Sequence, residues 1–144
     1  MTVRMLRHSD VEGLREILRA EVATLPPRLC CTLEAAEEFI HSHLDTGGFG
    51  LVVLGGEGLP LGCYLGRVVT LPAATRPIIA DVFFSANCPG VMDAIAPEIA
   101  HLARLWDCPA YTLSVNSRKK EVVERWGLRY GMRHVTTVLM SEPM

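Results

Sequence analysis

Two apolar runs separated by a glycine-rich turn limit the folds open to this chain more than any other feature. The first run, 49–54, reads FGLVVL, and the second, 59–71, reads LPLGCYLGRVVTL, with GGEG between them. Runs rich in valine and leucine that flank a short glycine-containing loop are typical of an antiparallel β-hairpin. A third run, 78–85, reads IIADVFFS and is apolar enough to predict a central strand. The chain therefore requires a sheet with antiparallel neighbours.

Helices are predicted on both sides of these strands. Their apolar residues recur every three or four positions, which is the spacing of an amphipathic helix. In the first of them, Val11, Leu14, Ile17, Leu18 and Val22 share one face. The segments with this spacing are 11–25, 32–48, 90–108 and 117–127.

Local signals suggest where these helices begin and end. Ser9-Asp10 is an N-cap pair for the first helix, and Thr32 is an N-cap for the second. Pro97 lies inside the third and predicts either a kink or a fresh helix start. Gly127 is expected to end the last helix in a left-handed conformation.

Shorter strands are expected near residue 3, over 109–115 and over 133–140, so the element order is β-α-α-β-β-β-α-β-α-β. A central hairpin followed by a βαβ unit implies a mixed sheet with helices on both faces. The predicted fold class is α/β (α+β), and 144 residues correspond to a single domain, 1–144.

Charge and hydropathy exclude several classes of protein. The net charge is -2, without the basic excess of a nucleic-acid-binding protein. No apolar run approaches the ~20 residues of a membrane span. The opening MTVRMLRHSD has no apolar centre like that of a signal peptide. We therefore expect neither a nucleic-acid nor a membrane partner.

The cysteines point to a reducing compartment. The chain has five, an odd number whose spacings match no disulfide framework, so we expect reduced thiols in a cytoplasmic protein, or one assembled from the cytoplasm. Cys30 and Cys31 precede His41 and His43, which could be read as metal ligands. Ordinary surface and core positions on a helix are the favoured interpretation, and no metal is predicted.

The element order resembles that of the GNAT acetyltransferase superfamily over nearly the whole chain. The opening VRMLRHSDVEGLREIL resembles the family's first strand and helix, and LVVLGGEGLPLGCYLGRV resembles its second and third strands. The family often reads N-x-x-A-x-x-L-Y-x-K-x-G-F near its C-terminus, and this chain reads NSRKKEVVERWGL, where Asn116, Arg125 and Gly127 keep the spacing. Asn116 can cap a helix or bind a pantetheine-like amide.

This C-terminal stretch departs from the family at its tyrosine, which often serves as general acid for the departing thiolate. Val123 stands at that position, and valine cannot donate a proton. Tyr130 follows the predicted helix end and is the candidate replacement.

The loop after the fourth strand carries the family's cofactor motif, Q/R-x-x-G-x-G/A, whose N–H groups hold the pyrophosphate of acetyl-CoA. Here the stretch reads SANCPGVMDAI, with Gly90 as its one glycine, Pro89 in place of an N–H donor and Asp93 in the first helical turn. The resemblance implies that this loop still binds acetyl-CoA, with fewer aids than is usual. The implied cofactor-binding residues are Phe84, Ser85, Gly90, Val91, Met92 and Asn116.

Asp81 is the candidate general base because the family often has a carboxylate in this strand. Strand alternation predicts that it shares a face with Ile79 and Phe83. The alternative is a structural ion pair with Arg67 or Arg76, and the sequence leaves both open.

Three functions remain open at this level. The resemblance implies an acetyl-CoA-dependent N-acetyltransferase with a small-molecule or protein amine as substrate. The losses in the motifs favour a catalytically inactive structural or interaction protein, for example a component of a phage virion, another assembly or a homo-oligomer. A cleft that binds some other small molecule is the third.

Overall fold

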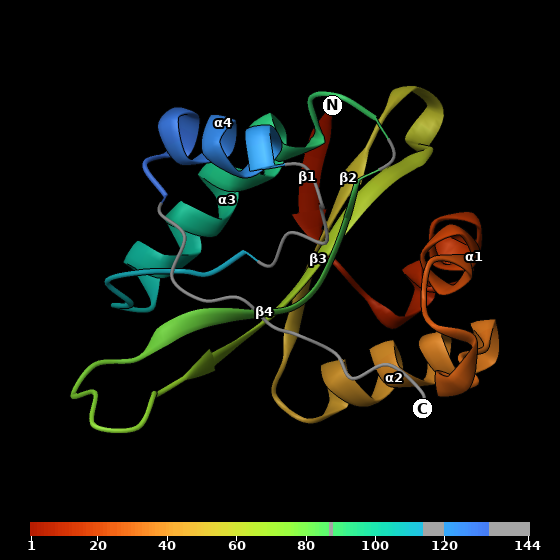
Figure 1. Ribbon diagram of the computed structural model, residues 1–144, viewed down its shortest axis with the longest axis horizontal. Helices are drawn as coiled ribbons and strands as arrows, with labels where there is room; N and C mark the ends of the chain where they lie inside the picture. The colour runs from red at the N-terminus through yellow and green to blue at the C-terminus, as the bar shows by residue number, and fades with distance from the viewer. Residues whose placement is uncertain (87, 114–119, 133–144) are drawn as a thin grey trace. The chain divides into compact units, whose positions relative to one another are not determined.

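A computed structural model describes residues 1–86, 88–113 and 120–132, in two units, Met1–Ser114 and Val115–Met144. The first unit is a twisted sheet with helices on both faces (Figure 1). The second unit contributes one described helix. The prediction that 1–144 forms a single domain stays a prediction.

The sheet has the strand order β1-β2-β3-β4, and all its neighbours are antiparallel. An isolated parallel bridge joins Ile79 to Tyr111, where the Ile79 N–H donates to the carbonyl of Ala110 and the Thr112 N–H donates to that of Ile79. The predicted mixed α+β sheet is therefore confirmed. The strands are β1 (Thr2–Met5), β2 (Phe49–Leu54), β3 (Pro60–Val69) and β4 (Ile78–Ala86).

Helices α1 and α2 lie on one face of the sheet, and α3 lies on the other (Figure 1). The third helix runs through Pro97 without a break, so the predicted fresh start there is wrong. The α-helices of this unit are α1 (Arg15–Ala23), α2 (Leu33–Asp45) and α3 (Val91–Leu105). Short 3-10 turns are η1 (His8–Asp10), η2 (Glu12–Leu14), η3 (Pro27–Leu29) and η4 (Gly56–Gly58).

Each face of the sheet buries a separate set of apolar side chains. On the α1 and α2 side, Leu14, Ile17 and Leu18 pack over Val52 and Leu65, as the helical spacing predicts. The α3 side is filled by other side chains that are at most 2% exposed, namely Leu51, Val53, Tyr64, Ile95 and Ile99. Alternation along the central strands thus supplies two cores.

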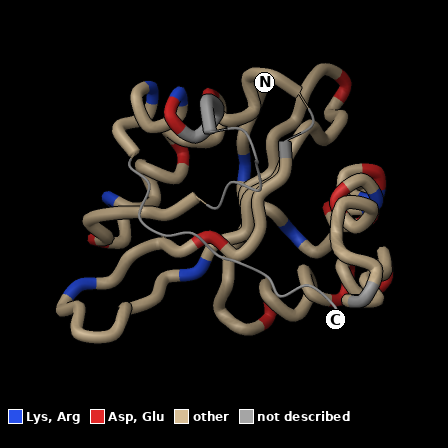
Figure 2. The backbone as a smooth tube through the Cα atoms, viewed as in Figure 1, with Lys and Arg blue, Asp and Glu red and all other residues tan. Residues whose placement is uncertain are grey.

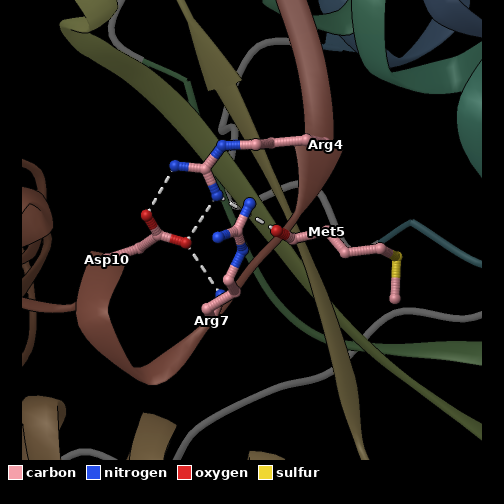
Figure 3. A network of polar contacts seen from close by, with 4 residues as sticks. All are labelled: Arg4, Met5, Arg7 and Asp10. Atoms are coloured by element: carbon pink, nitrogen blue, oxygen red, sulfur yellow. Dashed lines mark hydrogen bonds and ion pairs between the residues drawn. The ribbon is translucent and has the colours of Figure 1, made fainter.

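Hydrogen bonds to the Asp10 side chain link strand β1 to the short 3-10 turn η1 that follows it (Figure 3). The Asp10 carboxylate accepts hydrogen bonds from both terminal nitrogens of Arg4, at 2.7 and 2.6 Å, and from the main-chain N–H of Arg7 at 2.8 Å. These hydrogen bonds, first of all the one from Arg4, lower the pKa of Asp10 below its ordinary value. Asp10 lies within η1 instead of capping α1, so the cap prediction is wrong here. Thr32 does cap α2, through the N–H of Ala35.

His43 joins the end of α2 to the centre of the sheet. It is 4% exposed, and its Nε2 lies 3.0 Å from the carbonyl oxygens of both Phe49 and Gly66. A donor shared between these carbonyls ties β2 and β3 to the helix. Gly48 passes so close to the ring that a Cβ there would lie under 3.0 Å from its atoms.

The second unit contains α4 (Lys120–Tyr130). Gly131 follows with φ of 65°, and the Met132 N–H donates to the carbonyl of Gly127 at 3.1 Å. This is the six-to-one hydrogen bond that closes a helix on a left-handed glycine. The prediction that Gly127 ends the helix is therefore wrong, because Gly131 takes that role and Tyr130 lies in the last turn.

Candidate functional site

A β-bulge in β4 shapes the centre of the first unit. Leu65 pairs with Phe83, whereas the next residue, Gly66, pairs with Asp81, so Val82 is an extra residue. An extra residue turns the side chains beyond it to the other face. Phe83 therefore packs with Leu65 on the α1 and α2 side, while Asp81 faces the α3 side. The prediction that Asp81 shares a face with Phe83 is wrong for this reason.

Asp81 belongs to a polar cluster that connects β4 to the segment beside it. Its Oδ1 accepts the hydroxyl of Thr112 at 2.7 Å, and its N–H donates to the same hydroxyl oxygen at 3.0 Å. The Tyr64 hydroxyl donates to the Thr112 carbonyl at 3.1 Å. Burial, followed by the nearby Asp81 and Tyr111, raises the pKa of Tyr64. The cluster thus holds the Asp81 carboxylate in a fixed orientation.

The two arginines considered as structural partners of Asp81 make contacts elsewhere. Arg67 donates to the carbonyl and the hydroxyl of Thr46, and Arg76 pairs with Asp107 at 3.0 Å. The role of Asp81 as a base stays a prediction.

The start of α3 follows β4 closely. Gly90 is the N-cap residue, with φ of 92°, a left-handed conformation that favours glycine. Its carbonyl accepts the N–H of Ala94 at 3.0 Å, which opens the helix. The N–H groups of the first turn have no acceptor inside a helix. Because the side chains of Val91 and Met92 are buried, only their main chain can meet a ligand.

The predicted strand residues differ in what their side chains do. Phe84 lies opposite Tyr64 in the sheet. Ser85 is 3% exposed and donates its hydroxyl to Oε1 of Glu21 at 2.7 Å. Ser85 therefore faces α1, on the opposite side of the sheet from Phe84.

A pocket of about 320 Å³ opens between α1 and α2. Leu65 and Phe83 form its floor, and Glu21 brings a carboxylate to an otherwise largely apolar wall. The remaining lining residues are Leu18, Val22, Leu25, Leu29, Cys30, Cys31, Thr32, Ala35, Ala36, Phe39 and Ile40. Concave, mostly apolar sites with few polar groups are typical of small-molecule binding.

Sequence reasoning missed Glu21, although a signal was present. Glu21 follows Leu18 by three residues, Ile17 by four and Leu14 by seven, so it lies on the apolar face of the first helix. A charged residue on such a face is uncommon unless it has a partner. Burial, and after it the nearby Glu21 carboxylate, raises the pKa of the Cys63 thiol to about 12.

Two further predicted site residues, Tyr130 and Asn116, lie beyond the first unit. Tyr130 belongs to the second unit, where the Arg129 guanidinium lies 6.0 Å from its ring centre. Asn116 lies outside the described residues, as does any strand over 133–140. The roles suggested for Tyr130 and Asn116 stay predictions.

The cysteines and histidines occupy ordinary positions. None of the five cysteines forms a disulfide. His41 contacts His8 on the surface, with 2.7 Å between their Nδ1 atoms, and His43 is a core residue, as the favoured interpretation held. The described part of the chain contains no group of three or more potential ligands placed to hold a metal. None of its helices is long and apolar enough to cross a bilayer.

Comparison with solved structures identifies the fold. A GNAT family acetyltransferase from Staphylococcus aureus superposes with a TM-score of 0.69 at 14% identity, covering 99% of this chain and 100% of that one. The chain has the GNAT fold. No protein-family model matches the sequence, and a search of curated proteins finds no match either.

Other GNAT-fold structures align equally completely and differ in what they acetylate. A ribosomal-protein-alanine N-acetyltransferase from Brucella melitensis gives a TM-score of 0.67 at 13% identity, covering 99% of this chain and 100% of that one. An aminoglycoside 6'-N-acetyltransferase from Acinetobacter haemolyticus gives 0.69 at 10% identity, with coverage of 100% and 99%. At such identities the likeness extends to the fold alone.

Proposed function

We propose that this protein is an acetyl-CoA-dependent N-acetyltransferase that acts on a primary amine. The observation that carries the proposal is the GNAT fold over essentially the full chain, with the bulged strand β4 leading to the helix capped by Gly90. The acceptors of the similar structures range from a protein alanine to an aminoglycoside, so the fold by itself selects no amine.

The start of α3 is the proposed pyrophosphate site. Main-chain N–H groups at Gly90, Val91 and Met92 would hold the anion, aided by the positive end of the helix dipole. Pro89 supplies no N–H, and Asp93 adds a negative charge in the first turn, so we expect weaker binding than a glycine-rich basic loop provides. The side chains of Phe84 and Ser85 face opposite sides of the sheet, so their main chain, at the end of β4, would lie along the rest of the cofactor.

The proposed reaction is direct transfer. The lone pair of the neutral amine attacks the thioester carbonyl carbon, a C–N bond forms, and the C–S bond breaks as coenzyme A leaves. The amine gives up one proton, and the departing thiolate takes one up. Asp81 is the proposed base, directly or through water, and Tyr130 the proposed acid, because carboxylates and phenols exchange protons in such steps.

Calorimetric titration with acetyl-CoA tests the proposal. We expect micromolar binding in the parent protein and loss of binding in Gly90→Glu, which adds bulk and charge at the proposed site. Because Gly90 has a positive φ and its replacement strains the backbone, Asp93→Asn provides a second test with the opposite sign. Removing one charge beside the anion should tighten binding about two- to fivefold.

Glu98→Gln is the matched control, since Glu98 is exposed on the same helix and lies beyond the first turn. It should leave affinity unchanged. No binding to any variant at millimolar acetyl-CoA would refute the proposal. That result would favour the alternative, a GNAT-fold structural or interaction protein, which Pro89 and the charge of Asp93 also suggest.

A further inference from the structure

The pocket between α1 and α2 is open at the surface, and several of the side chains that line it are apolar and exposed to solvent. Leu25, Leu29 and Phe39 line it and are 38%, 47% and 49% exposed. Exposed apolar side chains gathered around one concavity mark a binding site more often than a random surface. Its volume of about 320 Å³ lies at the lower end of the range for small-molecule sites.

Glu21 supplies a negative group in this apolar setting. The Ser85 hydroxyl donates to its Oε1 at 2.7 Å, which orients the carboxylate between α1 and β4. The helix opposite, α2, carries Glu34, Glu37, Glu38 and Asp45 and neither lysine nor arginine (Figure 2). Glu37 pairs with Arg15 of α1 and Asp45 contacts His8, so the negative charge that α2 adds comes chiefly from Glu34 and Glu38. A cationic ligand would therefore meet an attractive potential at the rim and a fixed partner inside.

The pocket also adjoins the strand assigned to the cofactor. Its floor includes Phe83, which is next to the bulged residue Val82 on one side and to Phe84 on the other. The partner of Glu21 is Ser85, one residue farther along β4. A ligand whose nitrogen contacts Glu21 would thus lie against the strand where the thioester is proposed to bind. Asp81 faces the other side of the sheet, so in this arrangement it would act as the base only through water, and Glu21 is the carboxylate in contact with the nitrogen.

We propose that this pocket binds the acceptor, and that the acceptor is a primary amine carried on a compact apolar body, with its ammonium group held by Glu21. This inference rests on the proposed acetyltransferase function. The apolar body is matched by the lining residues, and the ammonium by a charge-assisted hydrogen bond. A hydrophilic polyamine or an aminoglycoside would leave several cationic groups against leucine and phenylalanine, so such compounds are rejected.

The first test measures binding without the cofactor, so that it does not depend on acetyl transfer. Calorimetry would compare 2-phenylethylamine with its neutral isostere 2-phenylethanol and with spermidine. We expect 2-phenylethylamine to bind at least about tenfold more tightly than either. A tripeptide amide beginning with phenylalanine distinguishes a peptide N-terminus from a free amine as the source of the same group.

Matched variants assign the binding to this pocket. Glu21→Gln removes the charge while its amide oxygen still accepts the Ser85 hydroxyl, and it should weaken 2-phenylethylamine binding about ten- to a hundredfold. Glu16→Gln on the same helix is the control, because that side chain is 82% exposed and pairs with Arg19. Ala35→Trp should block the pocket from its exposed edge without entering the core.

Three results would overturn the inference. The first is equal binding of 2-phenylethylamine and 2-phenylethanol. The second is equal loss in Glu21→Gln and Glu16→Gln. The third is a dimer in sedimentation that Ala35→Trp dissociates, since a second copy would then cover the pocket. Acetyl-CoA binding that persists alongside any of these would mean that only the acceptor assignment has failed.

Discussion

Replacing Gly48 by alanine should destabilise the protein strongly, through a single contact. A Cβ on Gly48 would lie under 3.0 Å from Cε1 and Nε2 of His43, closer than real Cβ atoms approach their neighbours. His43 is buried, so its ring can move away only by giving up the carbonyl oxygens of Phe49 and Gly66. The substitution therefore combines overpacking with loss of a shared hydrogen bond.

The expected size follows from these terms. Overpacking a core costs about 1–3 kcal/mol, and a buried donor left unpaired costs about 1–3 kcal/mol. Replacing glycine by alanine lowers the conformational entropy of the unfolded chain, which offsets about 0.4–1 kcal/mol of this destabilisation. The free energy of unfolding should fall by about 2–4 kcal/mol, which lowers the Tm by roughly 6–12 °C for a domain of this size.

Urea unfolding followed by circular dichroism measures the change, with Gly56→Ala as control. A Cβ on Gly56 would meet no atom within 4 Å, so alanine there should shift stability by less than about 0.5 kcal/mol. In a His43→Ala background the ring is absent, and Gly48→Ala should then add little. If Gly48→Ala and Gly56→Ala unfold at the same urea concentration, the packing argument is refuted.

Three further predictions concern charge, reactivity and a helix end. Arg4 lowers the pKa of Asp10 in the folded state, so the Arg4–Asp10 pair stabilises the fold above the unfolded pKa near 4, and this stabilisation is lost as the pH falls through the folded pKa. Asp10→Asn should remove this acid dependence, worth about 0.5–1 kcal/mol, as unfolding measured between pH 2 and pH 6 would show. Cys63 is fully buried with its pKa raised to about 12, so a thiol reagent at pH 8 should label exposed Cys30 first and leave Cys63 unlabelled until unfolding, as mass spectrometry would detect. Gly131→Ala should destabilise the end of α4 by about 1 kcal/mol, measured as faster amide exchange there, because alanine is strained at a φ of 65°.

Local sequence signals predicted much of the fold correctly. The strand over 49–54 has the predicted bounds, and its hairpin partner and the strand starting at Ile78 lie within two residues of their predicted limits. Thr32 caps α2 as expected. These features depend on turn chemistry and side-chain periodicity within a few residues, which a sequence displays directly.

The sequence predicted helix ends wrongly where two nearby residues could take the same role or where another side chain binds the expected cap. Two glycines stand near the end of α4, and the sequence favours Gly127 for the left-handed position, whereas Gly131 occupies it. Asp10 has the right side chain for a cap, but it accepts the N–H of Arg7 at the start of η1 and the guanidinium of Arg4, and no N–H of α1. Such choices depend on which partner is within reach, and propensity alone does not rank them.

What the sequence by itself determined is the order of the helices and strands from β1 to α3 and the apolar face of α1, because 3.6- and 2-residue periodicities are local. The tertiary structure alone decided which side of the sheet each β4 residue faces, since the bulge at Val82 appears only when β4 pairs with β3. It also brought Glu21 to Ser85, 64 residues along the chain, and Thr112 to Asp81, 31 residues back. Both contacts form between packed elements, and the candidate site consists of such contacts.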